Sequence, residues 1–184
     1  MTGSIDPRAF RDALGLFASG VAVIATHAGA EIHAMTASAV SSLSLEPPLV
    51  LFCPARAARF SQHLESAQNF SINFLREEQQ ALSSYFAGAW REAKLPPYRF
   101  VDFGGVPRLE GALTSLACAK ERVLDGGDHL IAIGRVVAIH RGVLPYRPLL
   151  FFGGAYRAVS AEAGTAAPDL AAAHDEPPHV FYAD

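Results

Sequence analysis

The feature that most constrains the fold is a tight turn between two long apolar runs. The turn is Asp125-Gly126-Gly127-Asp128, and its glycines are typical of a β-hairpin because they adopt positive φ angles without strain. Leu113 to Val123 precedes the turn and His129 to His140 follows it, and both runs have the composition of strands. The pattern predicts a long antiparallel hairpin.

Shorter segments around this hairpin indicate further strands and a few helices. Strands are expected at Val21–Thr26 before a turn at Ala28-Gly29-Ala30, at Leu49–Cys53, at Phe70–Phe74 and at Leu149–Phe152. Helices are expected from Pro7 to about Ser19, ended by Gly20, from Phe60 to Ala67, and from Glu77 to near Gly88. Trp90 to Val106 is expected to be a long irregular connection and is a candidate lid. Hairpin-linked strands with few helices predict a mostly β fold, an antiparallel barrel with peripheral helices.

Length and composition indicate one domain. The chain has 184 residues, of which we expect 1–159 to form the domain and 160–184, rich in Ala, Glu, Asp and Pro, to form a flexible tail. Hydrophobic residues make up 51% and charged residues only 18%, which is more apolar surface than a lone monomer usually buries. A homodimer would explain this composition.

Several functional classes lose support. A net charge of -3 without a basic stripe argues against nucleic-acid binding. The chain has no apolar signal segment and no apolar run long enough to span a membrane, so we expect a cytoplasmic protein. Seven histidines and two cysteines, Cys53 and Cys118, show no zinc-site spacing, so no metal site is expected. Motifs of α/β-hydrolases, P-loop NTPases and Rossmann folds are absent.

A serine-rich stretch from Met35 to Pro48 is the first candidate binding site. Read as one strand, it places Thr36, Ser38, Ser42 and Ser44 on a single face. Every polar side chain on that face is a short hydroxyl, which can lie flush against a large flat ligand. A hydroxyl-rich strand that simply faces water accounts for the pattern equally well, and the window alone leaves both interpretations open.

A series of ordered motifs then resembles one known family. The motifs are Phe10-Arg11-Asp12-Ala13-Leu14, Ala18-Ser19-Gly20-Val21, Met35-Thr36-Ala37-Ser38, Ser42-Leu43-Ser44, Pro47-Pro48-Leu49, Gly127-Asp128-His129 and Gly134-Arg135-Val136. From about Pro7 to Tyr156 the chain resembles the flavin reductases, the small reductase components of two-component flavin monooxygenases. The resemblance implies an FMN-binding split β-barrel of antiparallel Greek-key type, usually a homodimer. It also implies hydride transfer from NADH or NADPH to FAD or FMN, with the reduced flavin passing to a partner oxygenase or halogenase.

The resemblance implies a set of cofactor-binding residues as well. Isoalloxazine contacts fall on Met35, Thr36, Ala37 and Ser38, with Ser41 and Ser42 nearby. The ribityl chain and phosphate would meet Cys53, Ala55, Arg56, Ala57, Arg59 and Phe60, and Tyr85, Phe86, Ala87 and Tyr156 would line the same groove or stack on a ring. Asp128 and His129 belong to the motif associated with the nicotinamide, which makes His129 the candidate catalytic residue.

Two departures and several alternatives accompany the resemblance. Arg56-Ala57-Ala58-Arg59 lacks the hydroxyl that the family often carries in its phosphate loop, so Arg56 or Arg59 is expected to compensate. Gly153 stands where the family commonly has an arginine. Gly127-Asp128-His129 is also consistent with plain turn chemistry. Competing functions are a flavoprotein that keeps its FMN and reduces another small molecule or a metal centre, and a non-enzymatic flavin-binding module.

Overall fold

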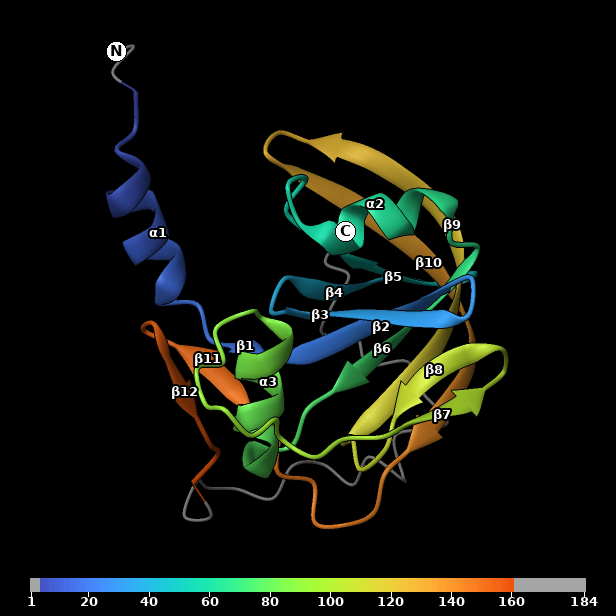
Figure 1. Cartoon of the computed structure of the whole chain (residues 1–184). Coiled ribbons are helices and arrows are strands. Elements are labelled where there is room, and N and C mark those ends of the chain that lie inside the picture. Colours follow the sequence, from blue (N-terminus) through green and yellow to red (C-terminus); the bar gives the residue numbers. More distant parts are fainter. Residues whose placement is uncertain (1–3, 161–184) are drawn as a thin grey trace.

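The computed structural model describes residues 4–160, which form a curled antiparallel sheet with helices around it (Figure 1). The sheet has seven strands in the order β3-β2-β6-β9-β10-β5-β4. These are β2 Ala22–Ala28, β3 Glu31–Ala37, β4 Val40–Leu45, β5 Pro48–Phe52, β6 Asn69–Phe74, β9 Thr114–Gly126 and β10 His129–Arg141. The predicted tail, 160–184, lies outside the described residues apart from Ser160.

The two edges of this sheet are consecutive strands. β3 and β4 stand at opposite ends of the strand order, yet only Ser38 and Ala39 separate them in the chain. The sheet must therefore curl until its edges approach at this two-residue corner, although the edges do not pair there as they would in a closed barrel. The chain also crosses from β5 over two strands to β6, a long connection of the kind found in Greek keys. The predicted antiparallel split barrel is confirmed.

The predicted long hairpin is present as β9 and β10. The two strands pair from His129 opposite Gly126 to Arg141 opposite Thr114, with irregularities beside Gly134 and between Val136 and Ala138. Gly127 has a φ of 77°, which is the conformation that the turn was expected to need.

Within residues 4–160, four helical segments lie outside the sheet: α1 Pro7–Gly15, α2 Arg59–Ser66, the short 3-10 helix η1 Glu77–Gln79 and α3 Gln80–Phe86. Asp6 caps α1 as predicted, because its carboxylate accepts from the Arg8 and Ala9 N–H groups. The prediction that this helix continues to Ser19 is wrong. It ends at Gly15, and β1 (Ser19–Gly20) instead pairs with β11 (Leu150–Phe152), which also pairs with β12 (Ala155–Arg157).

The predicted irregular connection from Trp90 to Val106 is only partly correct. β7 (Phe100–Phe103) and β8 (Val106–Leu109) form a hairpin in its second half. Gly104 and Gly105 make the turn, with φ angles of 62° and 80°. Paired glycines are a hairpin signal, so this strand pair was visible in the sequence. The first half, before Phe100, has no regular secondary structure.

The core lies on both faces of β2. Ala22 and Ile24 point into a cluster that contains Phe52, Phe70 and Leu64, under α2. Val21, just before the strand, and Val23 point the other way, toward α3 and the three-stranded sheet β1-β11-β12. The cluster that they join there contains Leu75, Leu82, Leu109 and Leu149. Strand alternation explains the two directions, and burial on both faces explains why this strand is almost wholly apolar.

Membrane insertion was not expected from the sequence. Within residues 4–160, no helix combines the length and the apolar character that crossing a bilayer requires.

Candidate active site

An open pocket of about 570 Å³ lies at the corner where the edges of the sheet approach. It is bounded by the end of α1 and β1, by the Ser38–Ala39 corner, and by the end of β5. The residues that line it are Leu14, Phe17, Ala18, Ser19, Gly20, Ser38, Ala39, Val40, Ser41, Leu51 and Cys53. Its volume is within the range of small-molecule sites, roughly 300–1,000 Å³.

The lining is mostly small, and none of the residues that form it carries a charged side chain. A Cβ added to Gly20 would meet no atom within 4 Å, so the pocket is open at this point rather than filled by the chain's own side chains. The Cys53 N–H donates to the Ala39 carbonyl at 3.0 Å, which ties the end of β5 to the corner. Such a site suits a flat ligand with a polar edge, because backbone groups and hydroxyls can reach it closely.

Cys53 and Cys118 are both free thiols. Burial raises the pKa of the Cys53 thiol, and it raises that of Cys118 to about 12. Both thiols are therefore protonated near neutral pH, and Cys53 contributes a small neutral group to the pocket wall. This agrees with the interpretation of both residues as small hydrophobes.

Only part of the predicted isoalloxazine site reaches this pocket. Ser38 and Ser41 line it, and Ser42 follows as an exposed residue of β4. Met35 and Ala37 do not line the pocket, because Ala37 belongs to the core cluster under α2 and Met35 packs against it. The side chain of Phe60, predicted to contact the ribityl chain or phosphate, is also buried in that cluster.

The predicted single hydroxyl face is wrong. β3 ends at Ala37 and β4 begins at Val40, and the pairing of β4 shifts again between Ser42 and Ser44. Strand alternation is lost at both points, so the hydroxyls do not share one face. The Thr36 hydroxyl, for example, donates to the Ser83 carbonyl of α3 at 2.7 Å.

The predicted phosphate segment lies against the turn of the long hairpin. Ala55 bridges to His129, and the Leu130 N–H donates to the Pro54 carbonyl at 2.9 Å. Because Cys53 lines the pocket and Pro54 follows it, this backbone contact connects the pocket wall directly to the predicted nicotinamide motif. Ala57 and Arg59 are on the same segment, with Arg59 exposed at its end.

Asp128 and His129 form a pair at the start of β10. The distance between His129 Nδ1 and Asp128 Oδ1 is 2.8 Å. This hydrogen bond lowers the pKa of Asp128 below its usual range, so the carboxylate is ionised near neutral pH and only accepts. His129 Nδ1 must then be the donor, which orients the half-buried ring and leaves Nε2 available to a ligand.

The predicted aromatic residues gather elsewhere. None of Tyr85, Phe86, Ala87 or Tyr156 lines the corner pocket. The Phe86 ring contacts Tyr98 and Phe100, with centroids 5.0 and 5.9 Å apart, which joins α3 to the start of β7. Tyr85 lies 5.5 Å from Tyr98, and its hydrogen bond raises the pKa of Tyr98. The Tyr156 hydroxyl is 2.9 Å from Ser83 Oγ.

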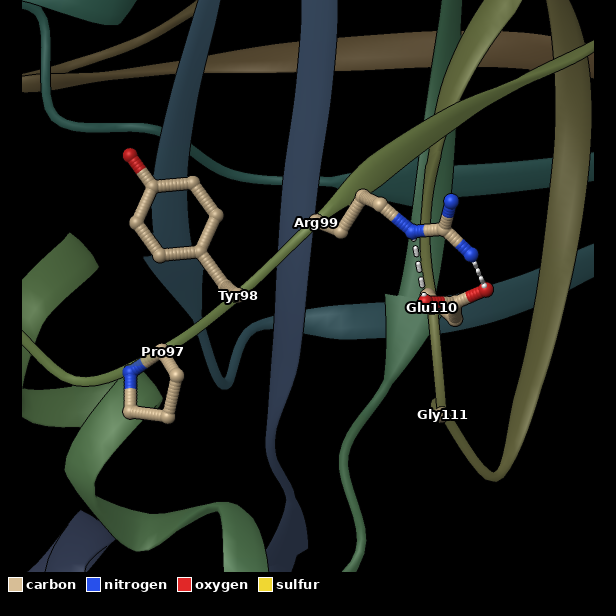
Figure 2. Close-up of a pocket in the computed structure, with 5 residues that line it drawn as sticks. All are labelled: Pro97, Tyr98, Arg99, Glu110 and Gly111. Atoms are coloured by element: carbon tan, nitrogen blue, oxygen red, sulfur yellow. Dashed lines mark hydrogen bonds and ion pairs between the residues drawn. The ribbon is translucent and has the colours of Figure 1, made fainter.

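A second hollow of about 450 Å³ lies beside this aromatic group (Figure 2). It is lined by Pro97, Tyr98, Arg99, Glu110 and Gly111. Figure 2 shows Arg99 and Glu110 joined by two contacts, one of them an Arg99 Nε to Glu110 Oε2 bond of 2.8 Å. The charges in this hollow therefore satisfy each other, and no predicted site residue lies in it.

Sequence reasoning missed most of the pocket's wall. Leu14 and Phe17 were expected only as part of the helix from Pro7 to about Ser19, and Ala18, Ser19 and Gly20 carried no predicted binding role. Leu14 and Ala18-Ser19-Gly20 also lie in motifs of the family resemblance, but no cofactor contact was assigned to them. Ala39, Val40 and Leu51 carry no signal of their own.

Comparison with known proteins agrees with the geometry. Residues 14–160 match the family model described as a flavin reductase like domain. The chain is 36% identical over 178 residues, 91% of its length and 90% of the relative's, to the reductase subunit HsaB of a flavin-dependent monooxygenase of Mycobacterium tuberculosis. It is 41% identical over 149 residues to the reductase component of 4-hydroxyphenylacetate 3-monooxygenase from Thermus thermophilus, covering 81% of this chain and 94% of that protein.

A solved structure gives the same answer. The Streptomyces globisporus NADH:FAD oxidoreductase SgcE6, in complex with NAD and FAD fragments, superposes with a TM-score of 0.76 at 31% sequence identity, covering 89% of this chain and 100% of that one. The matched range, 14–160, contains every strand of the barrel and every residue that lines the pocket. The chain therefore belongs to the flavin reductase family.

Proposed function

We propose that this protein is an NAD(P)H-dependent flavin reductase that supplies reduced FAD or FMN to a flavin-dependent monooxygenase or halogenase. The observation that carries the proposal is the small-residue pocket at the split of the barrel, whose wall continues through Pro54 into the segment paired with His129. Names of the relatives support both halves of the reaction, since one is an NADH:FAD oxidoreductase and two are monooxygenase reductases.

The chain's part in this reaction is binding and orientation. A bound flavin and nicotinamide would exchange the hydride between their own rings, so no protein nucleophile is needed. Ser38, Ser41 and the backbone of the corner would hold the flavin edge, and Arg59 would face its phosphate. His129, oriented by Asp128, would contact the nicotinamide. Orientation of this kind can supply roughly 7 to 11 kcal/mol of the barrier.

A bulky residue at the corner tests the flavin site. Ser38→Tyr is expected to fill the pocket and to weaken FMN binding, measured by fluorescence titration. Ser66→Tyr is the control, since Ser66 is an exposed serine at the end of α2 that neither lines the pocket nor belongs to the predicted cofactor contacts. Normal FMN affinity in Ser38→Tyr would contradict the site.

Removal of the imidazole tests the nicotinamide site. His129→Ala is expected to slow flavin reduction by NADH in stopped-flow experiments while flavin affinity is kept. His27→Ala, an exposed histidine at the end of β2, is the control. Unchanged reduction with lost flavin affinity would refute the assignment.

We also propose a homodimer that buries α1. This helix has no buried residue in the single chain, and Figure 1 shows it standing away from the sheet. Phe10 and Phe17 are 58% and 79% exposed. Because Leu14 and Phe17 also line the pocket, the second copy would close the site as it covers the helix. Phe10→Glu is expected to yield monomers in sedimentation experiments, whereas Leu95→Glu, a change at another exposed apolar residue, is expected to leave dimers.

The location and partner follow from the same proposal. We expect the protein to work in the cytoplasm, where its nicotinamide donor is found, and to reach its oxygenase through diffusible reduced flavin. Rapid loss of flavin on dialysis would support this over a flavoprotein that keeps FMN.

A further inference from the structure

The side chain of Arg56 crosses from the phosphate segment to the turn of the long hairpin. Its Nη2 lies 2.5 Å from Asp125 Oδ1, and its Nε donates to the Gly127 carbonyl at 3.4 Å. Its backbone N–H donates to the Asp128 carbonyl at 2.9 Å. One arginine therefore contacts three of the four turn residues, from a segment 69 to 72 positions earlier in the chain.

These contacts act on the residue that precedes His129. The turn contains two consecutive glycines, and Gly127 has a φ of 77°, so little in the turn itself restricts the direction of Asp128. Asp128 in turn orients the His129 ring through the 2.8 Å bond to Nδ1. Any swing of the turn would carry the carboxylate and the imidazole with it, and the Arg56 contacts oppose that swing.

Arg59 differs from Arg56 in this respect. It is the exposed first residue of α2, three positions along the same segment, and within residues 4–160 it makes no ion pair or side-chain hydrogen bond. A phosphate could recruit Arg59 without breaking any existing contact. Recruiting Arg56 would instead require the Asp125 pair to open.

We propose that Arg56 is a positioning residue for His129 and that the flavin phosphate is contacted by Arg59. This inference rests on the proposed reductase function and divides the two arginines that the sequence left equivalent. It makes Arg56 part of the nicotinamide half of the site, although it lies in the segment that the family resemblance assigns to the flavin.

Riboflavin, which lacks the phosphate, separates the two roles. Steady-state NADH oxidation would be measured with FMN and with riboflavin for wild type, Arg56→Ala and Arg59→Ala. Arg56→Ala is expected to lower kcat/KM for NADH by about two- to fivefold with either flavin, the range for losing one exposed ion pair, and to leave the flavin KM unchanged. Arg59→Ala is expected to raise the KM for FMN and not that for riboflavin.

Substitutions at Asp125, the ion-pair partner of Arg56, test whether the loss of NADH efficiency can be reversed. Asp125→Ala is expected to lower kcat/KM for NADH as much as Arg56→Ala does, and the double alanine variant is expected to lower it no further. The reversed pair, Arg56→Asp with Asp125→Arg, is expected to recover part of the kcat/KM for NADH. Thermal unfolding of each variant would check that the barrel is intact. A general loss of structure would not be repaired by exchanging two exposed charges.

Failure of this inference can be distinguished from failure of the proposed function. A raised KM for FMN alone in Arg56→Ala, with a normal response to NADH, would overturn the inference and return the phosphate to Arg56. Absence of oxidation of both NADH and NADPH by the wild type with every flavin would overturn the proposed function, and this role of Arg56 with it.

Discussion

At Gly134 even the smallest side chain is predicted to lower the stability of the fold. It lies in β10 beside the first pairing irregularity, and a Cβ at this position would overlap the Phe70 ring, with Cε1 at 2.9 Å and Cys118 Cβ at 3.1 Å. Phe70 has no exposed surface and packs against the Phe52 ring at 5.1 Å, so it has no space to move into. Gly134→Ala is therefore an overpacking substitution.

The expected cost follows from that geometry. Forcing a methyl group into a filled core costs about 1–3 kcal/mol. In a domain of this size each kcal/mol shifts Tm by roughly 2–4 °C, so Gly134→Ala should lower Tm by about 2–12 °C. Thermal unfolding followed by circular dichroism would measure the shift. Gly15→Ala is the control, because a Cβ at Gly15 meets nothing within 4 Å.

A second substitution identifies the cause. Phe70→Leu removes the ring atoms that the new methyl group would strike, so Gly134→Ala should cost much less in that background than in the wild type. An equal Tm decrease in both backgrounds, or no decrease in the wild type, would refute overpacking as the cause.

Three further predictions concern the core, the pocket and pH. Asn73→Ala should destabilise the protein by about 1–3 kcal/mol in urea unfolding, because the buried Leu109 N–H donates to Asn73 Oδ1 at 2.9 Å and would lose its acceptor. Asn69→Ala, at an exposed asparagine, should have little effect, and equal effects of the two substitutions would contradict this role. FMN should slow alkylation of Cys53, which lines the pocket, while buried Cys118 reacts only on unfolding; an unprotected Cys53 would place the flavin elsewhere. Arg99 lowers the pKa of Glu110, so this pair stabilises the fold above the usual glutamate pKa and loses its effect as pH falls through the lowered value. Glu110→Gln should therefore be less stable than wild type near neutral pH and converge with it in acid, and a difference that grows in acid would reverse the sign.

Local patterns were sufficient for much of the fold. The hairpin around Asp125–Asp128 and the start of the first helix at Asp6 could be predicted because their signals are turn and capping residues within a few positions. The end of that helix could not, since Ser19 pairs with Phe151 and helical periodicity contains no information on a partner so distant in the chain. The Phe100–Leu109 hairpin was missed despite its paired glycines.

The site was predicted less completely than the fold. The family resemblance pointed to Ser38, Ser41 and Cys53, which do line the pocket, but strand alternation failed at the Ser38–Ala39 corner, where the sheet splits. The Arg56–Asp125 pair depends on how two separated segments fold together. Its two charges have no distinguishing pattern in sequence, so only the three-dimensional arrangement assigns them a role.

A reductase of this kind turns over flavin many times and releases it reduced. The most direct test mixes a small amount of protein anaerobically with excess FAD or FMN and NADH or NADPH, and then measures reduced flavin in an ultrafiltrate free of protein. We expect the whole flavin pool to be reduced and recovered in the filtrate with at least one donor and flavin pair. Reduction that stops at one flavin per protein, or that does not occur with any pair, would contradict the account.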